Sequence, residues 1–391
     1  MQLSVFEMAR RLMRAPRPGR CRATCISFGS IGRPAGKLLA VAAALAVAST
    51  QVLAGDASPY PPVVEGRPLQ FPADTGAHPD FRTEWWYVTG WLEDEQGVER
   101  GFQVTFFRVR TRIGEQNPSR FAPRQLILAH AAVADPAEGR LLHAERAERA
   151  LDPLAGAAVG RTHAWARDWS LEWRDDHYEA RVAADGFGFD LRFDPPGPPL
   201  LNGNEGFSRK GPGAKDASHY YSRPQLAVGG TLILRGKSHD VRGRAWLDHE
   251  WSSEYLPEGA RGWDWIGINL HDGGSLMAFR MRDAEGRAIW SAGTLRAGTD
   301  APLALASDQV DFIPGRRWRS PRTGTQYPVE WDVLIDGRRL RLEPLMDDQE
   351  LDSRRSTGAV YWEGAVRVLE DGREIGRGYL EMTGYAERLR M

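Results

Sequence analysis

The sequence predicts a mostly antiparallel β protein, arranged as a sandwich or barrel and present as two copies of one domain. Short segments of alternating apolar and polar residues, separated by turns rich in Gly, Pro, Asn and Asp, fill the chain after about residue 80. Helical periodicity is nearly absent there. Three of these segments recur later in the same order, which indicates an internal duplication.

The first predicted hairpin shows the pattern clearly. Residues 84–92 are aromatic and β-branched, residues 93–97 form a turn, and residues 101–110 alternate as the return strand. Similar strands are predicted at 126–133, 169–173, 178–183, 187–193, 226–235, 243–252, 265–270, 276–281, 329–335, 339–342, 365–369 and 379–385. The Gly-rich stretch 203–213 is expected to be an irregular loop, and its spacing is not that of a phosphate loop.

The duplication rests on three matches in the same order. Residues 86–94 resemble 265–272, residues 221–228 resemble 361–368, and residues 243–249 resemble 376–382. We therefore expect an N-terminal domain over 73–253 and a C-terminal domain over 254–391. In the third match Met382 stands where the first copy has His249, so a strand at this position does not require a histidine.

His249 stands out because of where the strand period points it. In the strand 243–252, His249 and Trp251 share one face with Ala245, and Asp248 and Glu250 share the other. An imidazole aimed into an apolar core must find a hydrogen-bond partner or serve a function. The two interpretations, a structural histidine and a functional one beside a ligand hollow, both remain open from the sequence.

Two acid–indole motifs are further candidates. Glu84-Trp85-Trp86 and Trp263-Asp264-Trp265 each place a carboxylate beside indoles. Such aromatic residues either fill a β core or line a cavity for an apolar ligand. A desolvated acid there would have a raised pKa and could donate a proton, whereas an acid in a salt bridge with an arginine could not.

Composition excludes several classes of function. After residue 54 the chain carries 43 basic against 51 acidic residues, a net charge of −8, which argues against nucleic-acid binding. The histidines lack helical i, i+4 spacing, so no metal site is predicted, and no cofactor is expected. No Gly-x-Ser-x-Gly motif marks a serine nucleophile.

The N-terminus predicts secretion. An uncharged run of ten residues, 38–47, follows Arg33 and Lys37, and Val52 and Ala54 supply small residues for cleavage after Ala54. We expect residues 1–54 to be a signal peptide, residues 55–72 an extended lead-in, and the protein to be periplasmic. Both cysteines precede the run, so the mature chain would have no disulfide.

Several motifs together resemble the tandem-lipocalin family of carotenoid 1,2-hydratases and AttH-like secreted bacterial proteins. These motifs are 78–90, 203–211, 220–224, 248–251, 361–364 and 378–385. The resemblance implies two lipocalin-like β-barrels. In the hydratase branch a protein acid protonates an isoprenoid double bond without a cofactor, and the family's His-x-Trp pair corresponds to His249 and Trp251. The branch's following Tyr-x-Asp is missing here, where Trp263-Asp264-Trp265 stands instead.

Three functions follow from this resemblance. The first is binding of an apolar or isoprenoid-like ligand, the second is hydration of such a ligand by His249, Trp251 and Asp264, and the third is a non-catalytic accessory role in ABC export. The expected partners are an apolar small molecule or lipid and an ABC transporter permease, and peripheral membrane contact stays open. The expected ligand-binding residues are Glu84, Trp85, Trp86, Tyr220, Tyr221, Asp248, Glu250, Trp263 and Trp265.

Overall fold

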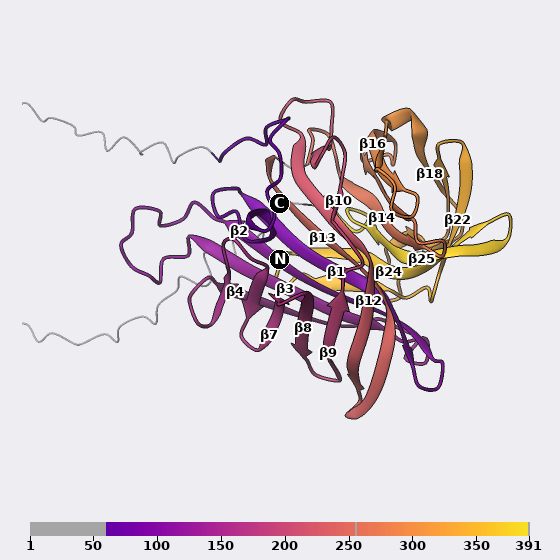
Figure 1. Ribbon diagram of the computed structural model, residues 1–391, viewed down its shortest axis with the longest axis horizontal. Coiled ribbons are helices and arrows are strands. Elements are labelled where there is room, and N and C mark those ends of the chain that lie inside the picture. The colour runs from indigo at the N-terminus through magenta and orange to yellow at the C-terminus, as the bar shows by residue number, and fades with distance from the viewer. Residues whose placement is uncertain (1–59, 255, 390–391) are drawn as a thin grey trace, which may run out of the picture.

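The computed structural model describes residues 60–254 and 256–389, which form two large antiparallel sheets side by side (Figure 1). The predicted signal peptide, 1–54, lies outside the described residues. In the part of the chain that is described, no helix has the length and apolar character needed to cross a bilayer. Two short 3₁₀ helices, η1 (Ala73–Thr75) and η2 (Ser307–Gln309), are the helical elements of these residues.

The first sheet curls into a nearly closed barrel. Within the described residues it has 13 strands in the order β4-β3-β2-β1-β13-β12-β9-β8-β7-β6-β5, with β10 and β11 added to β12. The two edges meet where Arg146 of β4 donates to the Ala166 carbonyl of β6 at 2.9 Å. The strands are β1 (Thr83–Asp94), β2 (Glu99–Arg110), β3 (Gln125–Ala134), β4 (Leu142–Arg149), β5 (Ala155–Ala157), β6 (His163–Ala166), β7 (Trp169–Arg174), β8 (His177–Ala183), β9 (Phe187–Asp194), β10 (Leu200–Leu201), β11 (Phe207–Arg209), β12 (Ala217–Leu234) and β13 (Lys237–Glu254).

The second sheet repeats this design on a smaller scale. Over the described C-terminal residues it has 10 strands in the order β17-β16-β15-β14-β25-β24-β22-β21-β18, with β23 paired to β24. Arg280 of β15 donates to the Phe312 carbonyl of β18 at 2.9 Å, so the sheet also curls toward itself. The strands are β14 (Gly262–Leu270), β15 (Ser275–Arg282), β16 (Ala288–Arg296), β17 (Leu303–Leu305), β18 (Val310–Pro314), β21 (Trp331–Ile335), β22 (Arg338–Pro344), β23 (Glu350–Ser353), β24 (Ala359–Glu370) and β25 (Arg373–Met382), and the hairpin β19 (Arg317–Arg319)–β20 (Gln326–Pro328) lies apart.

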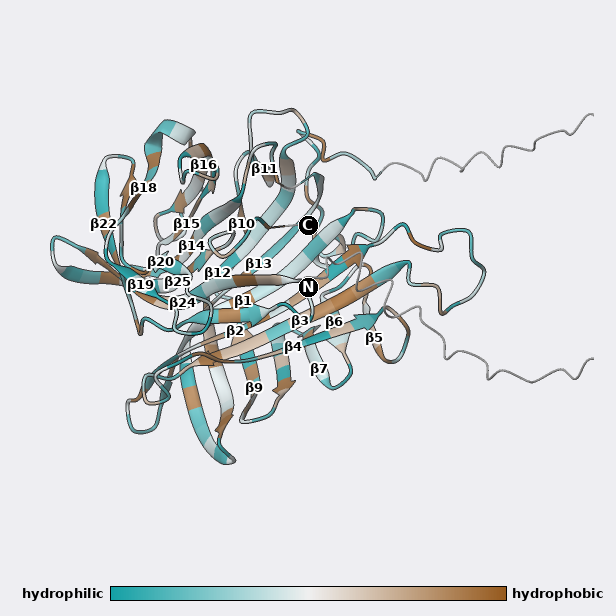
Figure 2. Cartoon of the chain, turned by 180° about the vertical axis from the view of Figure 1, so that it is seen from behind, coloured by the Kyte–Doolittle hydropathy of each residue, from teal (hydrophilic) through white to brown (hydrophobic). Residues whose placement is uncertain are grey.

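Each barrel has its own apolar core. Strands such as β9, with burial alternating residue by residue, turn Phe189 and Leu191 inward and Asp190 and Arg192 outward. Figure 2 shows this alternation as hydrophobic and hydrophilic residues along the outer strands. The predicted all-β class is confirmed, and the change from the first sheet to the second falls between Glu254 and Gly262.

The two barrels are packed against each other along a surface that we call the seam. Its apolar residues are Trp85, Tyr87, Trp91, Leu200, Tyr220, Trp246, Trp263, Trp265, Met277, Phe279, Met281, Ala365 and Tyr379. Buried hydrogen bonds cross it: the Gln225 backbone N–H donates to Asn269 Oδ1 at 2.7 Å, and Trp91 Nε1 donates to the Gly378 carbonyl at 3.0 Å. The seam therefore combines apolar packing with buried hydrogen bonds between the two barrels.

The structure corrects two expectations from the sequence. The stretch 203–213 is not simply an irregular loop, because Phe207–Arg209 forms β11 and Lys210 is buried. In the first repeat match the alignment is displaced by one residue: Trp86 lies opposite His249, but Asp264, not Trp265, lies opposite Met382. A slip of one residue reverses the face of a strand, so Trp86 points into its barrel and Trp265 points into the seam.

Candidate functional site

The residues predicted for the site divide between three places. Glu84, Trp86, Tyr221, His249 and Trp251 point into the first barrel. The seam receives the side chains of Trp85, Tyr220, Asp248, Glu250, Trp263 and Trp265. Asp264 points into the second barrel. This division follows from strand alternation in β1, β13 and β14, and it separates the predicted catalytic residues from most of the predicted ligand-binding residues.

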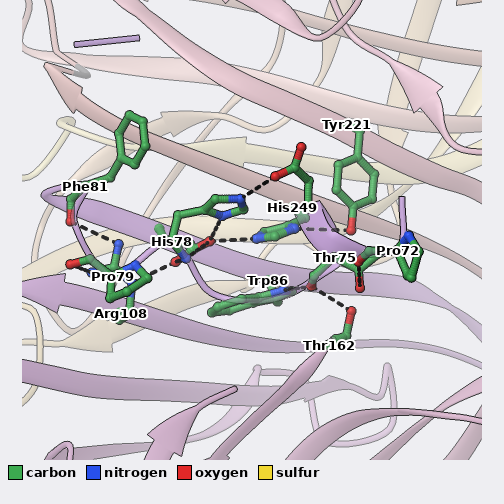
Figure 3. A network of polar contacts seen from close by, with 12 residues as sticks. Pro72, Thr75, His78, Pro79, Phe81, Trp86, Arg108, Thr162, Tyr221 and His249 are labelled. Carbon is green, nitrogen blue, oxygen red and sulfur yellow. Dashed lines mark hydrogen bonds and ion pairs between the residues drawn. The ribbon is translucent and has the colours of Figure 1, made fainter. Parts of the chain in front are cut away.

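Glu84 is the centre of the polar cluster inside the first barrel. Its partners His78, Arg108 and His249 are labelled in Figure 3. Its Oε2 accepts from Arg108 Nε at 2.7 Å, and its Oε1 lies 2.7 Å from His78 Nδ1 and 2.9 Å from His249 Nε2. The other nitrogen of His249, Nδ1, lies 3.1 Å from the Tyr221 hydroxyl. The carboxylate needs a donor from His249 Nε2, so Nδ1 is the nitrogen that accepts from Tyr221.

Burial and pairing set the charges of this cluster. Burial acts to raise the pKa of Glu84, but Arg108 and the two histidines outweigh it and hold that pKa well below its ordinary value. Burial lowers the pKa of His249, so its ring is neutral at pH 7. His78 also loses solvent, yet hydrogen bonds to Asp74 and Glu84 raise its pKa above 6.5. The His78 ring stacks on Trp251, with ring centroids 3.7 Å apart.

The hollow expected beside His249 is filled by side chains. The His249 ring stacks on Trp86 with centroids 4.7 Å apart, meets Tyr221 edge-on, and is wholly buried, as is Trp251. The cavity in the seam is lined by His249's neighbours Asp248 and Glu250 and not by His249 itself. In this geometry the contacts of His249 and Trp251 are those of a structural cluster.

The same cluster is the group of described residues closest to a metal-binding arrangement. One ligand atom each of His78, Glu84 and His249 lie within 4.8 Å of one another. However, the Glu84 carboxylate is already paired with the Arg108 guanidinium, and both imidazoles donate hydrogen bonds to it. These donors satisfy the oxygen lone pairs that a cation would need, so the chemistry favours a hydrogen-bonded network.

Asp264 is held by arginines. Arg280 Nε lies 2.7 Å and Arg282 Nε 3.2 Å from its Oδ2, and the Tyr385 hydroxyl donates to its Oδ1 at 3.0 Å. The carboxylate is fully buried on the inner face of the second sheet, whereas His249 is on the inner face of the first. The structure does not bring His249 and Asp264 together, because the two side chains point into different barrels and away from the seam between them.

A cleft opens at one end of the seam. Its outer part has a volume of about 560 Å³ and its narrow inner part about 50 Å³. The two parts share Phe107, Trp263, Tyr361 and Glu381, so we treat them as one seam cleft. The outer walls are largely apolar, with Val109, Leu128, Leu256 and Leu389, and the inner part is lined by Trp85, Tyr87, Thr105, Phe107, Asp248, Glu250, Trp263, Trp265, Tyr361, Glu363 and Glu381.

Two acids of the inner cleft come from β13. Asp248 accepts hydrogen bonds of 2.6 Å from Tyr220, Ser222 and Trp246, yet burial outweighs them and raises its pKa to about 7. Glu250 lies 2.7 Å from Lys210 Nζ, and burial still raises its pKa. The strand positions these carboxyls because odd residues fill the barrel and even residues face the seam.

Two further acids, Glu363 and Glu381, come from the second barrel and were not among the predicted site residues. They lie directly opposite each other on β24 and β25. Burial raises the pKa of Glu363 well above 4.5 and that of Glu381 to about 7. The negative charge of the neighbouring Glu381 carboxylate raises the pKa of Glu363 further. The hydroxyls of Tyr87 and Tyr361 lower the pKa of Glu363, but neither of its oxygens accepts a hydrogen bond of normal length from the described residues.

A sequence signal for this pair existed. In the motifs 361–364 and 378–385, Glu363 and Glu381 each stand two residues from a tyrosine on the same strand face, Tyr361 and Tyr379. The strand carrying Glu381 was predicted over 379–385, but the other was predicted to begin only at residue 365, after Glu363. Neither this extension nor the register was predicted, so the two acids could not be placed opposite each other. Together the indoles and the carboxyls with raised pKa values, Asp248, Glu363 and Glu381, give the cleft an apolar wall ending in buried acids, an arrangement able to donate a proton to an apolar ligand.

Comparisons with known proteins agree with this architecture. The family model described as AttH-like matches residues 62–385. The crystal structure of an AttH protein from Nitrosomonas europaea is 50% identical, with a TM-score of 0.78 over 83% of this chain and 99% of that one. No curated protein matches the chain.

Two more distant structures share the fold. Kievitone hydratase from Nectria haematococca has 14% identity and a TM-score of 0.62 over 83% of this chain and 95% of its own. CghA, solved with Sch210972, has 13% identity and a TM-score of 0.50 over 78% of this chain and 90% of its own. At these identities the likeness shows the fold alone, and with it the predicted lipocalin-like architecture is confirmed.

Proposed function

The chain belongs to the AttH-like family, and from that premise we propose that it holds an apolar or amphipathic, isoprenoid-like molecule in the seam cleft. The observation that carries the proposal is the cleft itself. Its outer part has a volume of about 560 Å³ and mostly apolar walls, and its narrow inner part is lined by indoles and buried carboxyls. This volume lies within the range of small-molecule sites. The proposal moves the ligand from the interior of the first barrel, where His249 lies, to the surface between the barrels.

The proposal is tested by titrating the purified protein with farnesol and following heat or tryptophan fluorescence. Trp263→Ala removes an indole that lines both parts of the cleft, and we expect affinity to fall at least tenfold. Trp318→Ala is the matched control, because Trp318 lies on the separate hairpin β19–β20. His249→Gln should keep the affinity within about threefold. Equal loss in all three variants would contradict the placement of the ligand.

A second function, hydration of the bound molecule, is favoured by the raised pKa values of Glu363 and Glu381. We propose that one of these carboxyls transfers its proton to an isoprenoid C=C bond, forming a C–H bond and a tertiary carbocation that the indoles shelter. Water then adds to the cation through its oxygen, and the proton it loses returns to the carboxylate. No cofactor is required.

Hydration is measured as a mass gain of one water, with ¹⁸O incorporated from labelled water. We expect Glu381→Gln to lower turnover by about 10²-fold or more while farnesol binding survives, since a general acid contributes on this scale. Binding without any mass gain in the unaltered protein would leave the binding function alone. Native mass spectra of protein from its own host that show an empty cleft, together with no saturable farnesol binding, would instead favour the accessory role in ABC export.

A further inference from the structure

A second cavity lies at the other end of the seam. Its volume is about 760 Å³, and it is separated from the seam cleft by the aromatic residues of the seam, including Trp246 and Trp265. Apolar side chains form much of its wall: Trp91, Leu92, Pro196, Pro198, Val228, Trp246 and Leu270. We call it the Arg296 pocket, after the side chain that distinguishes it.

The charges of this pocket are not balanced by its own residues. Four arginines line it, against the carboxylates of Glu93 and Asp272. Glu93 is already paired with Arg242 at 2.8 Å, and Asp272 Oδ1 accepts from the Gly274 backbone N–H at 2.8 Å. A surplus of positive charge therefore remains at the wall of a largely apolar cavity.

The arginines differ in what holds them. Arg377 is bound by Glu99 and by Glu374, each at 2.6 Å, so it is fixed by the protein. Arg244 is exposed and makes a single long hydrogen bond of 3.4 Å to the Gln225 carbonyl. Arg296, at the end of β16, has no ion pair with a described residue, and its Nε is buried without a hydrogen-bond partner.

An unpaired, partly buried guanidinium is costly, and proteins satisfy such groups with an anion. Burial alone lowers the pKa of Arg296, in agreement with a cation that lacks a counter-charge in the described residues. Guanidinium matches the planar geometry of carboxylate and phosphate oxygens. A ligand that supplies this anion must also be compatible with the adjacent indoles of Trp91 and Trp246.

We propose that the Arg296 pocket binds an amphiphile by its anionic head, with Arg296 as the counter-ion, Arg244 as a second contact, and the indoles beside the apolar chain. The shared chemistry is an oxyanion on a hydrocarbon tail, which a free fatty acid and a phosphate-headed lipid both offer. This site is separate from the seam cleft in place and in chemistry, because the described lining of the inner seam cleft has buried acids and no arginine to pair with an anion.

The test is calorimetric titration of the full folded protein with dodecanoate, dodecyl phosphate and 1-dodecanol, each below its micelle concentration. We expect both anions to bind at least tenfold more tightly than the alcohol. Tighter binding of dodecanoate identifies a fatty-acid site, and tighter binding of dodecyl phosphate identifies a phosphate-head site. Binding of the alcohol as tight as that of both anions would overturn the proposal.

Variants assign the effect to one side chain. Arg296→Gln should lose at least tenfold in affinity for the anions, while Arg242→Gln, an exposed arginine on the same pocket that Glu93 already pairs, should stay within threefold. Arg296→Gln should keep the thermal midpoint of the unaltered protein, since Arg296 has no partner to lose among the described residues. Anion affinity that is unchanged in Arg296→Gln, with the fold intact, would refute the assignment.

One further comparison separates this site from the proposed function. Trp263→Ala, which alters the seam cleft, should leave dodecanoate binding unchanged, and Arg296→Gln should leave farnesol binding unchanged. If either variant lost binding of both farnesol and dodecanoate, the seam cleft and the Arg296 pocket would not be separate sites. Loss of farnesol binding alone would leave the Arg296 pocket standing.

Discussion

Replacing Glu381 by Gln should make the protein more stable at alkaline pH and flatten the dependence of its stability on pH. The carboxyl lies opposite Glu363 in the seam, and burial raises its pKa from 4.5 to about 7. The folded state therefore binds a proton that the unfolded chain has already released between these two pH values. Stability from this group is complete below about pH 4.5 and is lost as the pH rises through 7.

The magnitude follows from the displacement of the pKa. At about 1.4 kcal/mol per pKa unit, the loss between pH 4.5 and 8 amounts to as much as about 3 kcal/mol. The amide of Gln carries no charge at either end of this range and can still accept from Trp263 Nε1, which lies 3.2 Å from Glu381 Oε2. The variant should therefore avoid the loss that the unaltered protein suffers.

The assay is urea unfolding followed by tryptophan fluorescence at pH 5 and pH 8. The midpoint of the unaltered protein should fall between these pH values by more than that of Glu381→Gln. Glu370→Gln is the control: its exposed pairing with Arg338 contributes about 0–1 kcal/mol, and pairing lowers rather than raises its pKa. Parallel pH profiles for the unaltered protein and Glu381→Gln would refute the assignment of a raised pKa to this carboxyl.

Three other substitutions test the fold around the site. Arg108→Met should reduce the free energy of unfolding, measured by urea titration, by about 3–5 kcal/mol, because the buried Glu84 carboxylate would lose the guanidinium of Arg108. The double variant Arg108→Met with Glu84→Gln should regain part of this loss. Burial lowers the pKa of His130 to about 3, so the unfolded chain takes up a proton before the folded protein does as the pH falls below 6.5. The variant His130→Gln can keep the contact with Tyr361 and should unfold at a lower pH than the unaltered protein in an acid titration. The exposed control His271→Gln should unfold at the same pH as the unaltered protein. Gly267→Ala would bring a Cβ within 2.5 Å of the Trp265 ring and 3.1 Å of Trp246, and should lower stability by about 1–3 kcal/mol in thermal unfolding, with no change if the seam can open.

Strand content was predictable because alternation is a local property. Strands such as β8 and β9 have one face in a core and one in solvent, so their pattern identifies both the strand and its faces. The short strands β5, β10 and β11 escaped prediction because two or three residues carry no period. Because β11 was missed, the sequence predicts that Lys210, which follows it, is part of a loop, although its side chain is buried against Glu250.

The site was less predictable than the fold because its residues meet only through register. Strand period placed His249 and Asp248 on opposite faces correctly, but nothing local shows whether a face meets a filled barrel or a second domain. Glu363 and Glu381 lie on strands whose pairing the sequence does not specify. The repeat match placed Trp265 with Trp86, and a displacement of one residue was enough to send the two indoles to different surfaces.

The arrangement of β1 and β14 explains why the same strands serve stability and chemistry. Each of these strands is buried along nearly its whole length, because one face belongs to a barrel core and the other to the seam. A strand buried on both faces has no solvent side on which to keep its polar residues, so each one needs a partner or a proton. Inside the barrels arginines provide the partner, as Arg108 does for Glu84 and Arg280 for Asp264. In the seam Glu363 and Glu381 have no arginine beside them in the described residues, and burial raises the pKa of both carboxyls instead. This difference is the reason that we propose the chemistry for the seam and not for His249.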